Sequence, residues 1–145
     1  MNRLYTHHML EVLGLLMQWL HISSAAVLVG GLMYARLAMT PASEALAPEG
    51  RDALGERAAA AFQPLALAAM TGLIVSGLYN VISTPGHSMR YRAWLAVKLL
   101  LAAHMFAAAI LIGRPNRQRR PRLMMSACVS GLIVILIAAY LKRIF

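Results

Sequence analysis

The sequence predicts an all-α integral membrane protein, an up-down-up-down bundle of four transmembrane helices forming a single domain over residues 1–145. Of the 145 residues, 60% are hydrophobic and only 13% are charged, whereas about a quarter of a soluble domain is charged. Four apolar stretches each reach the roughly 20 helical residues needed to cross a hydrocarbon core. Short connections between them favour antiparallel neighbours. The four predicted helices cover residues 12–35, 58–82, 93–113 and 123–141.

The first two stretches differ in their polar residues. Residues 12–35 hold Gln18 and His21 and are too long and too polar for the apolar region of a signal peptide, so we expect a retained helix. In residues 58–82, Gly72, Ser76 and Asn80 lie four apart, which is typical of close helix packing. Residues 41–57 form the longest connection, and nothing in them predicts a second domain.

The last two stretches are bounded by turn-forming and basic residues. Residues 83–87 have the composition of a turn, and Pro115 with Asn116 ends the third helix. The single cysteine, Cys128, lies within the fourth stretch and has no intramolecular disulfide partner. We interpret it as a small packing residue.

The basic residues predict an orientation in the bacterial cytoplasmic (inner) membrane. The net charge is +9, but the arginines gather at helix ends and short connections, which favours a membrane topology signal over nucleic-acid binding. One face carries eight basic residues and the other five, so the positive-inside rule places both termini outside the cytoplasm. The eight are Arg36, Arg51, Arg57, Arg114, Arg117, Arg119, Arg120 and Arg122, and the five are Arg3, Arg90, Arg92, Lys142 and Arg143.

Two histidines, His21 and His104, each lie alone near the middle of an apolar stretch. An ionisable side chain inside a membrane is costly and usually marks a functional site. The two differ in depth by roughly 3 Å at 1.5 Å per helical residue. This predicts a haem b with both imidazoles as axial ligands between the first and third helices. Lys98, about 9 Å outward of His104, and Arg92 are the predicted partners of its propionates.

The two histidines are also compatible with packing, proton-transfer and copper-binding roles. Each could simply hydrogen-bond a neighbouring helix, while a proton relay lacks any intramembrane Asp or Glu to extend it. Copper is a further hypothesis, because imidazole and thioether together suit this metal. His7 and His8 before the first helix and His87 and Met89 in the second connection share one predicted membrane face. In this hypothesis His21, His104 and nearby methionines line a passage for copper, and the outer cluster of histidines and methionine feeds it.

Several segments resemble the copper resistance protein D (CopD) family. The run Trp19-Leu20-His21-Ile22, followed by residues 29–32, is similar to the first helix that this family shares. Residues 62–66 and 76–80 resemble its second helix, residues 92–99 its third, and residues 120–123 the start of its last. The resemblance covers most of residues 17–123 and implies copper handling.

The same pattern is similar to the HemJ type of protoporphyrinogen oxidase, a related four-helix haem-binding family. His21, with Tyr34 and Arg36 following it, matches the first-helix pattern of that group, and Lys98 matches its third-helix lysine. This resemblance implies haem binding and oxidation of a porphyrinogen. His104 departs from the pattern, because it follows Lys98 by only six residues.

Taken together, these observations favour a haem b-binding redox protein that transfers electrons in a membrane. Copper transport of the CopD type and a HemJ-like oxidase are the alternatives. If the chain is an enzyme, it belongs among the membrane oxidoreductases, and the chemistry would be that of the cofactor. The expected partners are the lipid bilayer and a periplasmic or membrane redox protein. The stripes of small residues would also permit a homodimer.

Overall fold

The computed structural model describes residues 2–83, 89–112 and 120–144 and is helical throughout these ranges apart from residues 44–47. The elements are α1 (Asn2–Tyr34), the π-helix η1 (Ala35–Met39), α2 (Thr40–Ser43), α3 (Pro48–Ser83), α4 (Met89–Ile112) and α5 (Arg120–Ile144). The all-α class is therefore confirmed. Among the described residues, four helical segments are long and apolar enough to cross a membrane.

The helices extend well beyond the apolar stretches that predict them. The expected connection over residues 41–57 is mostly helical, since α2 ends at Ser43 and α3 already begins at Pro48. Proline is favoured in the first helical turn, and the alanines, glutamates and arginines that follow it are strong helix formers. Hydropathy detects only the apolar part of a helix and therefore leaves out its charged ends. Residues 84–88 and Arg114–Asn116 lie outside the described ranges.

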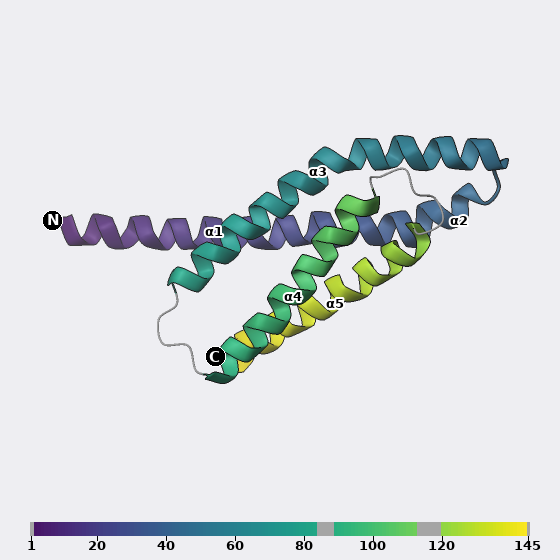
Figure 1. Cartoon of the computed structure of the whole chain (residues 1–145). Coiled ribbons are helices and arrows are strands. Elements are labelled where there is room, and N and C mark those ends of the chain that lie inside the picture. Colours follow the sequence, from purple (N-terminus) through teal and green to yellow (C-terminus); the bar gives the residue numbers. More distant parts are fainter. Residues whose placement is uncertain (1, 84–88, 113–119, 145) are drawn as a thin grey trace.

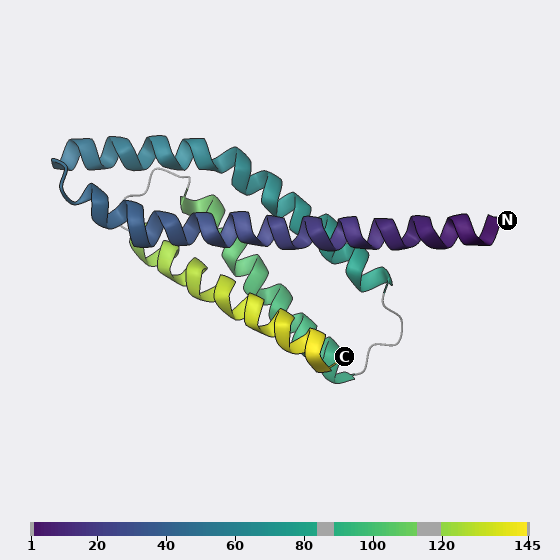
Figure 2. The same cartoon turned by 180° about the vertical axis from the view of Figure 1, so that it is seen from behind.

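Most helix packing falls in two pairs, α1 with α3 and α4 with α5, and α1 also packs against α5. Figures 1 and 2 show these pairs from opposite sides, with the N-terminal part of α1 projecting beyond the other helices. Its side chains are correspondingly open, as Tyr5 is 67% and Met9 72% exposed. At 33 residues, α1 is about 50 Å long, well over the ~30 Å of a hydrocarbon core.

The helix α3 contains Pro64 in its interior. A proline inside a helix removes one backbone hydrogen bond and bends the helix. Figure 1 shows α3 bending along its length, so that its C-terminal half crosses α1. That half carries Gly72 and Ser76, both buried.

The core lies where α1, α4 and α5 meet, and Gly131 on α5 makes their close approach possible. A Cβ placed at Gly131 would lie 2.9 Å from a methyl of Val29 on α1 and 3.2 Å from the sulfur of Met105 on α4. The γ-carbons of a valine cannot swing away freely, because its χ1 is restricted in a helix. The buried apolar residues around this point include Leu28, Val29, Leu32, Met105, Ala108, Ile112, Ala127 and Cys128.

We expect Gly131→Ala to destabilise the fold. The added methyl overpacks the contact with Val29 at about 1–3 kcal/mol, which outweighs the gain of up to about 1 kcal/mol in helix propensity. Thermal unfolding in detergent should show a lower midpoint. Gly30→Ala is the matched control, because a Cβ there meets nothing within 4 Å, and its midpoint should stay or rise. Equal behaviour of both variants would contradict this packing.

Candidate functional site

The site begins with a hydrogen bond between two helices. His21 on α1 and Ser76 on α3 are joined by a contact of 2.9 Å between Nδ1 and Oγ. Ser76 is fully buried and His21 is partly buried. The Ser76 hydroxyl also donates to the backbone oxygen of Gly72, one turn earlier in α3. Two polar side chains thus satisfy one another inside an apolar helix pair.

This network assigns the proton on the imidazole. A serine hydroxyl has one hydrogen, and the Gly72 oxygen accepts it, so Ser76 Oγ can only accept from His21. The Nδ1–H of His21 is therefore the donor. In a neutral imidazole the other nitrogen, Nε2, then carries a lone pair. A metal-binding histidine usually has this arrangement, with one ring N–H held by a protein oxygen.

Glycines let α1 and α3 approach closely enough for this bond. A Cβ at Gly72 would overlap the hydroxyl of Ser24 on α1, and one at Gly77 would lie 3.7 Å from Cε1 of His21. The predicted small-residue packing of α3 is confirmed for Gly72 and Ser76, which are buried, whereas Asn80 is exposed. The sequence pattern indicates the packing but does not identify Ser76 as the partner of His21.

Lys98 is the residue of α4 that the fold brings near His21. Its side chain is partly buried, and its ammonium group is close enough to interact electrostatically with the imidazole. Among the described side chains, no carboxylate pairs with it. The chain has only five acidic residues, and they lie at Glu11 and within residues 44–56. The site therefore combines an imidazole whose Nδ1–H is bonded to Ser76 with a cation that no described carboxylate offsets.

The other two residues of the predicted haem site have different surroundings. His104 is exposed on α4, and no described contact joins it to His21. The buried stripe of α4 passes through Met105, Ala108 and Ile112. Because successive residues are about 100° apart around a helix, this stripe leaves His104 on the flank. Counting residues predicts the depth of each histidine along its helix, but it does not predict the rotation of α4 about its own axis. Arg92, near the start of α4, is also exposed.

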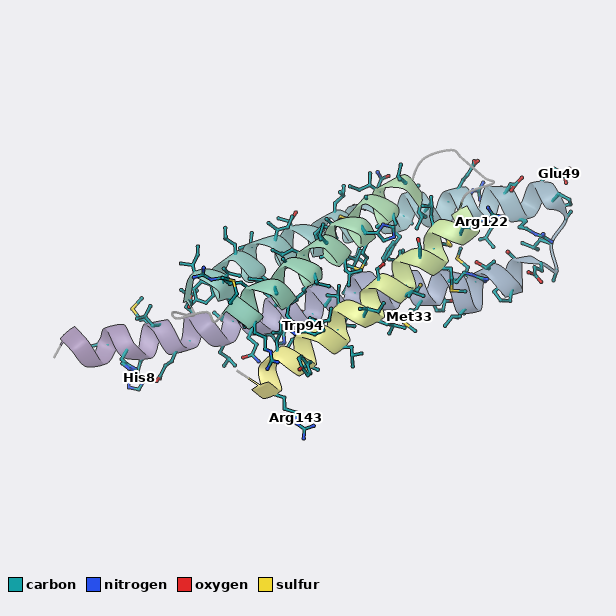
Figure 3. All side chains as sticks on the ribbon, turned by 60° about the horizontal axis from the view of Figure 1, so that its bottom comes forward. His8, Met33, Glu49, Trp94, Arg122 and Arg143 are labelled. Atoms are coloured by element: carbon teal, nitrogen blue, oxygen red, sulfur yellow. The ribbon has the colours of Figure 1, made fainter. Side chains whose placement is uncertain are left out.

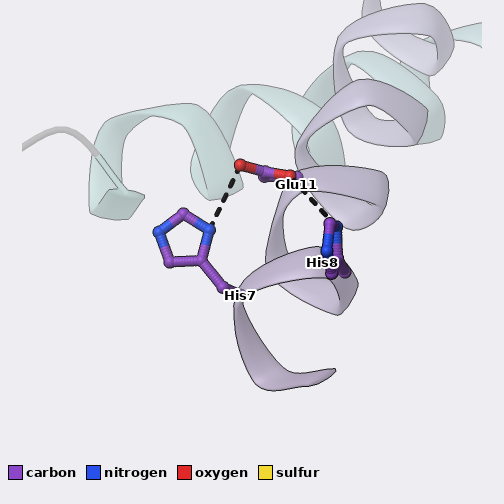
Figure 4. Close-up of polar contacts among 3 residues, drawn as sticks. All are labelled: His7, His8 and Glu11. Carbon is purple, nitrogen blue, oxygen red and sulfur yellow. Dashed lines mark hydrogen bonds and ion pairs between the residues drawn. The ribbon is translucent and has the colours of Figure 1, made fainter. Parts of the chain in front are cut away.

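The predicted copper residues lie apart from this site. His7 and His8 both contact Glu11 on the projecting part of α1, at 3.1 and 3.6 Å (Figure 4). His8 lies far out on this segment (Figure 3). Met89 is 81% exposed, and His87 lies outside the described ranges. Within those ranges, no group of three or more His, Cys, Asp or Glu side chains is arranged to hold a metal ion.

Two further features lie toward the other end of α1. The π-helix η1 contains Arg36, whose Nε is buried without a hydrogen-bond partner and whose charge acts on Cys128 of α5. A cavity of about 530 Å³ lies between η1, α2 and the first half of α3. Its walls are mainly apolar, with Arg51 and Asp52 among the lining residues, and neither His21 nor Lys98 lines it.

No protein family, curated protein or solved structure matches this chain.

The bond between His21 and Ser76 should appear as a coupling energy. We expect a double-mutant cycle of His21→Phe and Ser76→Ala to give about 0.5–2 kcal/mol, because Ser76→Ala leaves the Nδ1–H of His21 without its partner only while His21 is present. Reversible unfolding in detergent measures each variant. Ser23→Ala is the control, since Ser23 bonds the backbone oxygen of Trp19 on its own helix. Additivity in the Ser76 cycle would contradict the assigned bond.

Proposed function

We propose that the chain is a multi-pass protein of the bacterial cytoplasmic membrane that binds haem b and transfers electrons. When bound, haem b supplies a reversible one-electron iron couple. The chain's own residues would hold and orient it. The bilayer accounts for the four apolar spans, whose outer surfaces carry many exposed large hydrophobic side chains.

One observation carries the proposal, namely the state of the His21 ring. Ser76 holds the Nδ1–H, so Nε2 is left as a lone-pair donor of fixed direction. Imidazole is a frequent axial ligand of haem iron in proteins. The charge of Lys98 on α4 acts on the same ring, so a second helix pair contributes to the surroundings of His21.

Lys98 supports the same assignment through its charge. A partly buried ammonium without a protein carboxylate is costly, because neither water nor an anion offsets the loss of hydration. A carboxylate carried by the cofactor would offset it. Haem b carries two such groups as propionates, so Lys98 would fix the orientation of the cofactor relative to His21. Arg92 is exposed at the start of α4 and available to the same groups.

A HemJ-like protoporphyrinogen oxidase is the second candidate, and the pairing of His21 with Lys98 favours it. Both are among the residues by which the sequence resembles that family, and in the fold the charge of Lys98 acts on His21. Oxidation of a porphyrinogen would require a tetrapyrrole to bind at this place as substrate. Turnover of protoporphyrinogen by the purified protein distinguishes an oxidase from an electron carrier.

We expect His21→Ala to abolish haem binding and His104→Ala to retain it, because His21 is partly buried and its ring is held by a bond to Ser76, whereas His104 is exposed. Absorbance spectra of the purified variants, with haem quantified by pyridine haemochrome, make the test. A reducible Soret and α/β spectrum in wild type is the starting point. Loss of the spectrum in both variants would instead support two histidine ligands, as the sequence predicts. Retention in both would rule out His21 as a ligand.

The variant Lys98→Met tests the role of Lys98 through the midpoint potential of the bound haem. Removing a cation near the iron stabilises the oxidised form relative to the reduced form, so the midpoint potential should become more negative. Arg122→Met is the control, because Arg122 is exposed at the start of α5 near the opposite end of the bundle (Figure 3). An unchanged potential in Lys98→Met, with full haem content, would remove Lys98 from the site.

We also propose that both termini lie outside the cytoplasm, as the distribution of basic residues favours. Glu49 and His8 are exposed near opposite ends of the molecule (Figure 3). In a Cys128→Ala background, an impermeant maleimide applied to intact spheroplasts should label His8→Cys, and Glu49→Cys only after permeabilisation. The reverse labelling would place the termini in the cytoplasm.

A further inference from the structure

The exposure of His104 within an apolar span is not explained by the site around His21. It lies within the apolar span of α4, and its side chain is exposed. If the span crosses a bilayer, this imidazole would face hydrocarbon. Histidines inside membranes almost always face a protein interior or a water-filled cavity, because exposure of a polar group to lipid is costly. Something other than lipid is therefore expected to cover this face of α4.

The residues around His104 form a regular seam. Six positions alternate in spacings of four and three residues, and all of them are exposed; Val97 is 43%, Leu100 72% and Leu111 41% exposed. This is the heptad spacing by which two helices pack along one another with a left-handed crossing. The neighbouring stripe of α4, through Met105, already packs within the chain. The seam consists of Ala93, Val97, Leu100, His104, Ala107 and Leu111.

We propose that this seam is covered by a second copy of the chain, in a symmetric dimer that pairs the two α4 helices and brings the two His104 side chains together. This inference rests on the membrane insertion proposed above and is independent of haem binding. Two copies inserted in the same orientation are related by a two-fold axis along the membrane normal, so their α4 helices run parallel. In a parallel pair each seam residue meets its own counterpart.

The chemistry of imidazole favours a second copy over another partner. A neutral imidazole has one N–H donor and one lone-pair acceptor, so of two His104 rings at the axis one can donate an N–H···N bond to the other. A different protein would have to supply a polar side chain at this one depth within an otherwise apolar surface, whereas a second copy in the parallel pair has one there by symmetry. The small side chains of Ala93 and Ala107 would let the two helices approach closely. The seam therefore offers a second copy both close packing and a shared hydrogen bond.

Disulfide crosslinking in native membranes tests the dimer. Single cysteines are placed at Leu100 or His104 in a Cys128→Ala background, and the membranes are treated with a mild oxidant. We expect both variants to form a species of twice the 15.8 kDa chain mass, because seam positions in a parallel pair lie close enough for a disulfide. Leu99→Cys is the matched control. It is 58% exposed but faces about 100° away from Leu100, so it should remain monomeric.

A second variant tests the packing without an added crosslink. Ala107→Trp should shift the purified protein from dimer to monomer mass, because the indole overfills the seam. Ala139→Trp, at an exposed position of α5, should leave the dimer intact. The proposal is overturned if Leu99→Cys crosslinks as well as Leu100→Cys, or if neither seam cysteine crosslinks. Crosslinks to a product of any other mass would likewise overturn it. Haem content is measured separately and does not enter this result.

Discussion

Polar groups inside an apolar bundle must satisfy one another, and the hydrogen bond between His21 and Ser76 is where this chain meets that constraint. The bond requires α1 and α3 to pack closely. Gly72 provides the space, since a Cβ there would overlap the hydroxyl of Ser24 on α1. Pro64 bends α3 so that its second half crosses α1 at this level. The arrangement of the helix pair and the chemistry of the imidazole therefore depend on the same few residues.

The same bond divides the roles of the two nitrogens of His21. Because Ser76 donates its only hydrogen to a backbone oxygen, it must accept from Nδ1, and Nε2 of a neutral ring then carries the lone pair. In our proposal this lone pair binds the haem iron. A serine adds no charge to the site, and no described carboxylate pairs with Lys98, so in the same proposal a propionate of the cofactor offsets that cation.

The helix α4 has one side that packs within the chain and another that is exposed. Its buried stripe through Met105 and Ala108 packs against α5, and Trp94 continues this contact with Tyr140 at a ring separation of 5.4 Å. Lys98 lies at the edge of the buried stripe, and its charge acts on His21 of α1. His104 lies on the flank and is exposed. In our proposal, Lys98 completes the cofactor site, and the exposed seam around His104 joins two copies of the chain.

The sequence by itself determined the all-α class, the four candidate spans and the small-residue packing of α3, because hydropathy and helical spacing are local properties. It also identified His21 and Lys98 as unusual residues within apolar stretches. It underestimated the length of α3. The helix already begins at Pro48, but its first turns are charged, so hydropathy does not detect them. Only the tertiary structure decided that His21 bonds Ser76 and is affected by the charge of Lys98, whereas His104 is exposed. Depth along a helix follows from counting residues, but the direction of a side chain depends on the rotation of each helix, which packing between distant segments sets.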